Sequence, residues 1–79
     1  MKGGNMTTTL TNIEKKSIID QAIKQLDYSI YSSEIEVIQI EAVTPVDQEQ
    51  LSAYTARITN LNAKRAALVA EELLLADEE

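Results

Sequence analysis

The amino-acid sequence has neither cysteine nor histidine, and these two absences exclude most of the chemistry that proteins perform. Without cysteine the chain forms no disulfide, has no thiolate nucleophile and supplies no sulfur ligand to a metal ion. Without histidine it lacks the side chain that most often serves as a general base and as a transition-metal ligand. The missing cysteines also favour a cytoplasmic or virion-associated protein over a secreted one.

Glycine and proline are almost as rare. The chain has 2 glycines, both among its first four residues, and 1 proline. No glycine-rich loop is therefore available to surround a phosphate, which excludes the P-loop and Rossmann classes. With 7 basic and 13 acidic residues, the formal charge is −6, and the clustered lysines and arginines that bind nucleic acid are missing.

No run of 18 apolar residues exists, so we expect no membrane-spanning helix. The polar positions are acidic, whereas helices that lie on membranes usually carry Lys and Arg there. Residues 1–10 are rich in Gly, Asn and Thr and are predicted to be disordered. Residues 1–5 are too short and too polar for a signal peptide, and a native start at Met6 is one hypothesis for them.

The rest of the chain predicts an all-α fold, a two-helix antiparallel coiled-coil hairpin over residues 11–79. Thr11 and Glu14 have the spacing of a capping box, which starts a helix near 11–43. Thr44 and Pro45 then suit the N-cap and first position of a second helix near 45–77. A link of one or two residues implies that the helices run antiparallel.

One competing interpretation concerns residues 34–43, where isoleucine and valine are frequent. Such β-branched residues favour a strand. No other segment offers a partner strand, so we prefer the helix.

Both segments carry apolar side chains at alternating spacings of three and four residues, the heptad pattern of helices that pack along one stripe. We call this stripe the seam. Antiparallel pairing places the two halves of the seam face to face, with partner positions that add up to 87 or 88. The seam residues are Ile19, Ile23, Leu26, Ile30, Val37, Ile40, Leu51, Tyr54, Ile58, Leu61, Leu68 and Leu75.

Polar side chains interrupt the seam, and the register accounts for them. The small Ser33 falls opposite the large Tyr54, and Lys16 falls opposite Glu72, which pairs opposite charges. Arg65 falls opposite an isoleucine, where we expect its stem to pack and its head to reach solvent.

A second apolar stripe on the first helix, which we call the tyrosine face, is offset from the seam by five residues, or about 140°. It consists of Tyr28, Tyr31, Ile35, Ile38 and Ala42. Alanine also recurs every seven residues on the second helix, at Ala56, Ala63 and Ala70. The alternative to an interface is that the two tyrosines simply lie on the surface, partly exposed to solvent.

Two helices that touch along one seam bury too little apolar surface to order a chain of this length. We therefore expect a homo-oligomer, most simply a dimer of hairpins that forms a four-helix bundle with the tyrosine face as its interface. The side chains expected to carry this assembly are Ile30, Tyr31, Ile38, Ile58 and Leu61.

Carboxylates are the only plentiful reactive groups. Glu34 and Glu41 share a helical face, but no spaced Asp, Asn and Gly loop accompanies them, so we expect no metal site. Serines and threonines have no evident base beside them. We expect neither a cofactor nor catalysis.

The stretches IIDQAIKQLDYSIYSSEIEVIQIEAV and TPVDQEQLSAYTARITNLNAKRAALVAEE resemble small uncharacterised helical-hairpin proteins of marine, cyanophage-like tailed phages. The resemblance covers residues 7–79 and follows a common plan: a short polar start, a helix, a brief break and an acidic helix rich in Ala and Leu. It implies a helical hairpin and a viral origin, and no functional residue comes with it.

The sequence thus predicts a noncatalytic structural or protein-interaction module that self-associates. The alternative is a small acidic regulator or inhibitor that binds a basic protein partner. Its motivation is the net charge and an acidic end, made of Glu71, Glu72, Asp77, Glu78 and Glu79.

Overall fold

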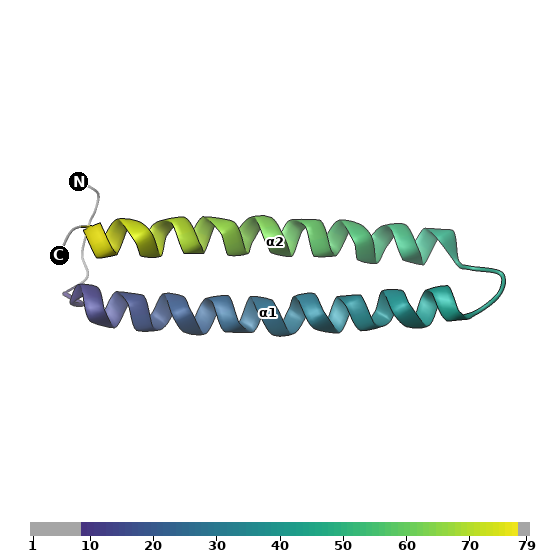
Figure 1. Ribbon diagram of the computed structural model, residues 1–79, viewed down its shortest axis with the longest axis horizontal. Coiled ribbons are helices and arrows are strands. Elements are labelled where there is room, and N and C mark those ends of the chain that lie inside the picture. The colour runs from purple at the N-terminus through teal and green to yellow at the C-terminus, as the bar shows by residue number, and fades with distance from the viewer. Residues whose placement is uncertain (1–8, 78–79) are drawn as a thin grey trace.

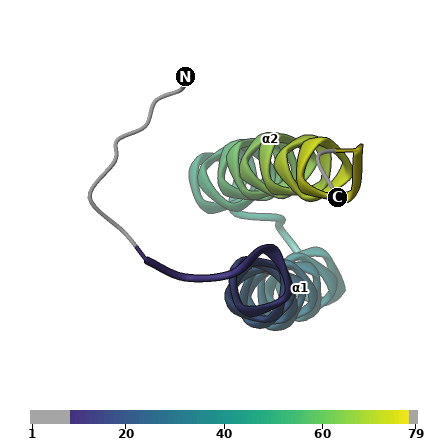
Figure 2. The same cartoon turned by 90° about the vertical axis from the view of Figure 1, so that its left-hand side faces the viewer.

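The computed structural model describes residues 9–77 and the side chains of residues 9–75. It contains two helices, α1 (Asn12–Ala42) and α2 (Gln48–Asp77), which lie side by side along a body of 53 × 20 × 18 Å. The helices run antiparallel, so the start of α1 and the end of α2 meet at one end and the connection turns at the other (Figure 1). The end-on view shows α1 and α2 next to each other (Figure 2). The predicted all-α hairpin is confirmed.

The described residues contain no strand, and the competing strand at residues 34–43 is wrong, because Glu34–Ala42 is continuous helix. The frequent β-branched residues there do not decide the outcome. Such residues favour a strand only where neighbouring strands complete a sheet, and residues 9–77 supply none. Of the predicted disordered segment 1–10, only Thr9 and Leu10 lie within the described part, and both precede the helix.

The start of α1 is the predicted capping box. The Thr11 side chain accepts a hydrogen bond from the Glu14 backbone N–H at 3.1 Å, and the Glu14 carboxylate accepts one from the Thr11 N–H at 2.8 Å. Two N–H groups that would otherwise lack partners at the helix end are thereby satisfied. At the other end, Val43 is extended and its N–H reaches back to the Ile40 carbonyl at 3.4 Å.

The start of α2 differs from the expected position by three residues. The N-cap is Asp47, whose carboxylate accepts a hydrogen bond from the Gln50 N–H at 3.1 Å, and the helix begins at Gln48. Thr44 and Pro45, expected to cap and open the helix, lie in the connection instead. Thr44 and Asp47 are both good N-cap residues, and in the structure the Asp47 carboxylate makes the capping hydrogen bond, so the helix starts after Asp47.

Few side chains of the hairpin are buried. Among the described residues, the buried apolar side chains are Leu61 and Leu75, with 9% and 5% of their surface exposed, and Ser33 is the buried polar one at 3%. This outcome follows from the architecture, because each helix has one neighbour and can cover only one stripe of its surface. The core of the hairpin is therefore a line of contacts and not a layer.

Candidate interaction surface

The seam lies where the two helices face each other. Each predicted seam residue is at least half-buried, and Leu61 and Leu75 are buried. The Asn12 side-chain amide donates a hydrogen bond to the Leu75 carbonyl at 3.3 Å, which joins the open ends of the two helices. These two positions add up to 87, so the bond matches the register expected from the sequence.

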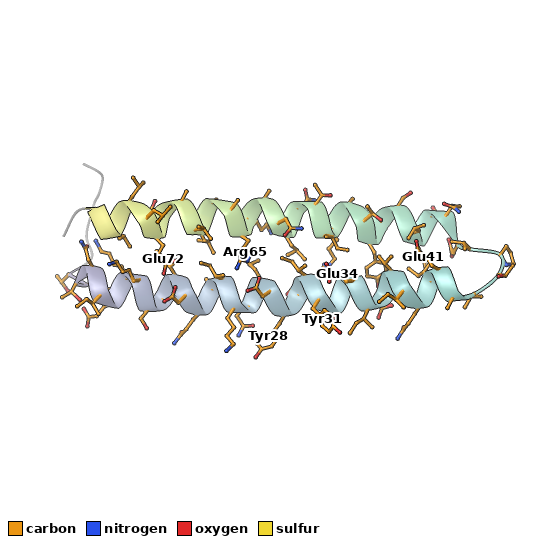
Figure 3. All side chains as sticks on the ribbon, in the orientation of Figure 1. Tyr28, Tyr31, Glu34, Glu41, Arg65 and Glu72 are labelled. Atoms are coloured by element: carbon orange, nitrogen blue, oxygen red, sulfur yellow. The ribbon has the colours of Figure 1, made fainter. Side chains whose placement is uncertain are left out.

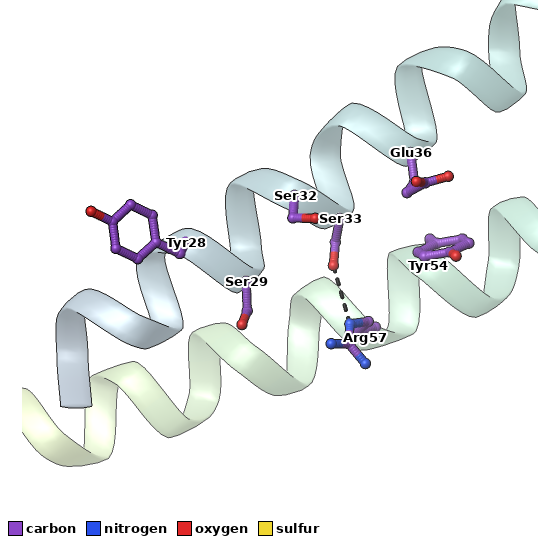
Figure 4. A pocket seen from close by; sticks show the side chains of 7 residues that line it. All are labelled: Tyr28, Ser29, Ser32, Ser33, Glu36, Tyr54 and Arg57. Carbon is purple, nitrogen blue, oxygen red and sulfur yellow. Dashed lines mark hydrogen bonds between the residues drawn. The ribbon is translucent and has the colours of Figure 1, made fainter.

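The middle of the seam contains a polar cluster around Ser33. Its hydroxyl accepts a hydrogen bond from the Arg57 Nε at 3.2 Å, and Tyr54 lies one turn away on α2 (Figure 4). A shallow groove of about 430 Å³ lies at this cluster. It is lined by Ser33, Tyr54 and Arg57 together with Tyr28, Ser29, Ser32 and Glu36. The sequence pattern predicts Ser33 opposite Tyr54, but it does not predict the hydrogen bond from Arg57. The signal was present, because Arg57 lies three residues after Tyr54 and so falls on the next turn of α2.

Arg65 makes an ion pair that the sequence analysis did not predict. Its Nε lies 2.7 Å from the Asp27 Oδ1, with 41% and 50% of the two side chains exposed. The hydrogen bond to Asp27, together with the charge of that carboxylate, raises the pKa of Arg65, and partial desolvation acts weakly against it. The arginine stem starts opposite Ile23, as expected, but the head binds a carboxylate one turn further along α1. Because both groups are half exposed, solvent and salt weaken the pair.

Glu72 lies half-buried between the helices, as Figure 3 shows, and it faces two groups of α1. A hydrogen bond with the Asp20 side chain raises its pKa above the ordinary glutamate value, and desolvation and the Asp20 charge act in the same direction. The positive charge of Lys16 opposes this shift. The expected attraction between Lys16 and Glu72 is therefore present. The effect of Asp20 on the pKa of Glu72 is larger, so the pKa is raised overall.

The tyrosine face points away from α2. Tyr28, Tyr31 and Ile38 leave 62%, 64% and 64% of their surfaces exposed, and Figure 3 shows both tyrosines on the side of α1 opposite the seam. Ala42 is exposed, and Ile35 is half-buried. The hairpin therefore leaves most of this stripe uncovered.

A matching stripe of smaller side chains occupies the outer side of α2, which we call the alanine face. It is offset from the seam by two residues throughout and is exposed along its full length. The sequence analysis identified three of its alanines, and the complete stripe is Ala53, Ala56, Asn60, Ala63, Ala67, Ala70 and Leu74.

The carboxylates form no evident chemical site. In the described part of the chain, no group of three or more acidic side chains could hold a metal ion. Glu34, Glu41 and Glu71 lie exposed on the surface. The side chains of Asp77, Glu78 and Glu79, predicted to form an acidic end, lie outside the described residues.

Neither described helix is long and apolar enough to cross a membrane. Comparisons with family models, curated proteins and solved structures gave no match. The resemblance to phage proteins therefore stays a prediction, and the surface of the hairpin is the basis of the proposed function.

Proposed function

We propose that this protein is a noncatalytic structural or interaction module that associates with copies of itself through the outer apolar faces of its helices. One observation supports this more than any other: the large side chains of the tyrosine face remain exposed in the folded hairpin. A fully buried tyrosine removes roughly 200 Å² from water, so each ring leaves on the order of 120 Å² open. Monomeric proteins rarely expose contiguous apolar patches larger than a few hundred Å², and the exposed side chains of the tyrosine face together reach that size.

The small core of the single hairpin supports the same proposal. Ordering the backbone and side chains of two helices, each about 30 residues long, requires more apolar burial than one seam supplies. A second copy would cover the outer faces and add the missing burial. The smallest assembly of this kind is a dimer of hairpins, which contains four helices.

The alternative, an acidic regulator of a basic partner, has less support. Glu72, one of the carboxylates on which it depends, lies between the helices against Lys16 and Asp20. It is therefore poorly placed to meet a partner. The net charge of −6 is equally well explained by solubility.

The proposal is tested by changing Tyr31→Asp and Ile38→Asp together, since both side chains are exposed and seven residues apart. We expect light scattering to show a smaller mass than for the unmodified protein, because four carboxylates would have to be buried in each contact between two tyrosine faces, and two in a contact with another face. An unchanged mass would contradict the proposal.

A matched control is Gln25→Asp with Ser32→Asp. These residues are also exposed, also on α1 and also seven apart, but lie off the tyrosine face. The control adds the same charge and the same two aspartates to the helix. It should keep the mass of the unmodified protein, and circular dichroism should show that both variants remain helical.

A further inference from the structure

We propose that the tyrosine face of α1 packs on the alanine face of α2 in a second copy, rather than on another tyrosine face. This inference depends on the proposed self-association and names the surface that each copy presents. The tyrosine face of one copy is then covered by α2 of a second copy of the protein.

The first argument is the direction of the two faces. The tyrosine face is offset from the seam by five residues and the alanine face by two, which correspond to about 140° and about 200°. Both offsets are closer to 180° than to 90°, so the faces lie on opposite sides of the flat pair of helices. A copy displaced sideways brings its α1 against α2 of its neighbour, with the helices antiparallel as they are within the hairpin.

The second argument is the fit of side-chain sizes. With the register of the hairpin itself, in which Asn12 meets Leu75, a copy moved sideways sets Tyr31 opposite Ala56 and Ile35 opposite Ala53. Well-packed helices alternate large and small side chains at facing positions, so that the two surfaces interdigitate. Two tyrosine faces would instead set large side chains against large ones.

The open end of the hairpin extends the same fit. The register places Glu14 opposite Leu74, which is 56% exposed, and Ile13, which is 72% exposed, lies beside Glu14 on α1. Between this pair and the tyrosines, the alanine face meets shorter or more flexible side chains of α1, such as Ser17 and Lys24. The contact would therefore run along most of the hairpin.

The third argument concerns area. A stable interface between two proteins buries about 800 Å² on each partner. The exposed parts of Tyr28, Tyr31 and Ile38 amount to roughly 350 Å², which is less than half of that area. A contact that runs along the whole of α1 also buries side chains such as Ser17 and Lys24, and so comes closer to the requirement than one confined to the tyrosine face.

A contact between unlike faces leaves each copy with one free face of each kind. Such contacts can repeat, so association need not stop at two copies. In a dimer formed by two tyrosine faces, by contrast, both tyrosine faces are already covered, so this contact adds no third copy.

Single cysteines test the contact directly, because the natural chain has none. One preparation carries Tyr31→Cys and another carries Ala56→Cys, and the two are mixed and oxidised. We expect several-fold more of the mixed cross-linked dimer than of either like pair. Thr55→Cys, one residue before Ala56 but on a different face of α2, is the matched control and should cross-link poorly with Tyr31→Cys.

A second pair, Ser17→Cys with Ala70→Cys, tests the same register nearer the open end, where both side chains are exposed. It keeps the test valid if one variant of the first pair packs badly. Preferential cross-linking of Tyr31→Cys to itself would overturn this inference and leave self-association intact. So would equal cross-linking to Thr55→Cys and Ala56→Cys. A folded monomer by light scattering would instead remove the proposed function itself.

Discussion

The seam of α1 and the tyrosine face of α1 have the same apolar spacing and opposite surroundings. Seam residues such as Leu26 and Ile30 are half-buried against α2, whereas Tyr28 and Tyr31 leave more than 60% of their surfaces exposed. The difference teaches that periodicity shows which side chains share a face, but not what covers that face. A covered stripe contributes to the stability of the hairpin, and an uncovered one is available for association.

Truncating a leucine of α2 to alanine should give the largest difference in the free energy of unfolding between a covered and an uncovered position. Leu61→Ala removes a buried side chain and leaves a cavity in the seam, and we expect it to lower the free energy of unfolding by about 2–4 kcal/mol. Leu73→Ala makes the same chemical change at a side chain that is 64% exposed, with an expected effect within about 0.5 kcal/mol. Urea unfolding at one fixed protein concentration measures both. Equal losses would show that the seam is not the core.

The next effect comes from enlarging the buried polar position. Ser33→Leu completes the heptad pattern, yet we expect it to destabilise the hairpin by about 1–3 kcal/mol, because Ser33 is 3% exposed and overpacking a filled site is costly. Ser33→Ala keeps the small volume and should cost at most about 1 kcal/mol, since the exposed Arg57 can turn to water. If Ser33→Leu stabilised the protein, the seam would have room that the structure does not show.

A smaller effect is expected at the start of α2. Asp47→Ala removes the N-cap hydrogen bond to Gln50 and should lower the free energy of unfolding by about 1 kcal/mol. Thr44→Ala, three residues earlier, should have little effect, because Thr44 lies in the connection. Thermal unfolding of the two variants distinguishes the N-caps. A larger loss at Thr44 would restore the helix start expected from the sequence.

The smallest effect concerns pH. The pKa of Glu72 is raised in the folded chain above the ordinary value of 4.5. Its contribution to stability is therefore fully present below the ordinary value and is lost as the pH rises through the folded value. Asp20 raises this pKa from α1, and Lys16, also on α1, opposes the rise.

Glu72→Gln keeps a side chain that can donate a hydrogen bond to Asp20 without carrying a charge. We expect the melting temperature of the variant at neutral pH to be slightly higher than that of the unmodified protein, with a smaller gain on acidification. Paired thermal melts at neutral and mildly acidic pH measure the difference. A variant that melts lower at neutral pH would show that the attraction to Lys16 dominates.

Much of the fold could be predicted from the sequence, because the deciding signals are local. The capping box at Thr11 and the heptad spacing depend on neighbouring residues, and both are present in the structure. The start of α2 could not be predicted in the same way. Thr44 and Asp47 are both good N-caps, and the local sequence pattern does not decide between them.

The polar contacts across the seam were harder to predict. Long side chains reach past their direct partners: Arg65 binds Asp27, one turn beyond the isoleucine opposite it, and Arg57 reaches Ser33 from beside Tyr54. The register fixes where a side chain starts, whereas the position of its charged end depends on neighbours a turn away. The tyrosine face is located by spacing alone, and what covers it depends on a second molecule.

The central claim, that copies of this chain cover the exposed apolar faces, is tested most directly by sedimentation equilibrium at micromolar concentration, with circular dichroism on the same sample. We predict a helical protein with a mass of at least twice the 8.8 kDa of one chain. A fully helical protein that sediments as a single chain would contradict the claim.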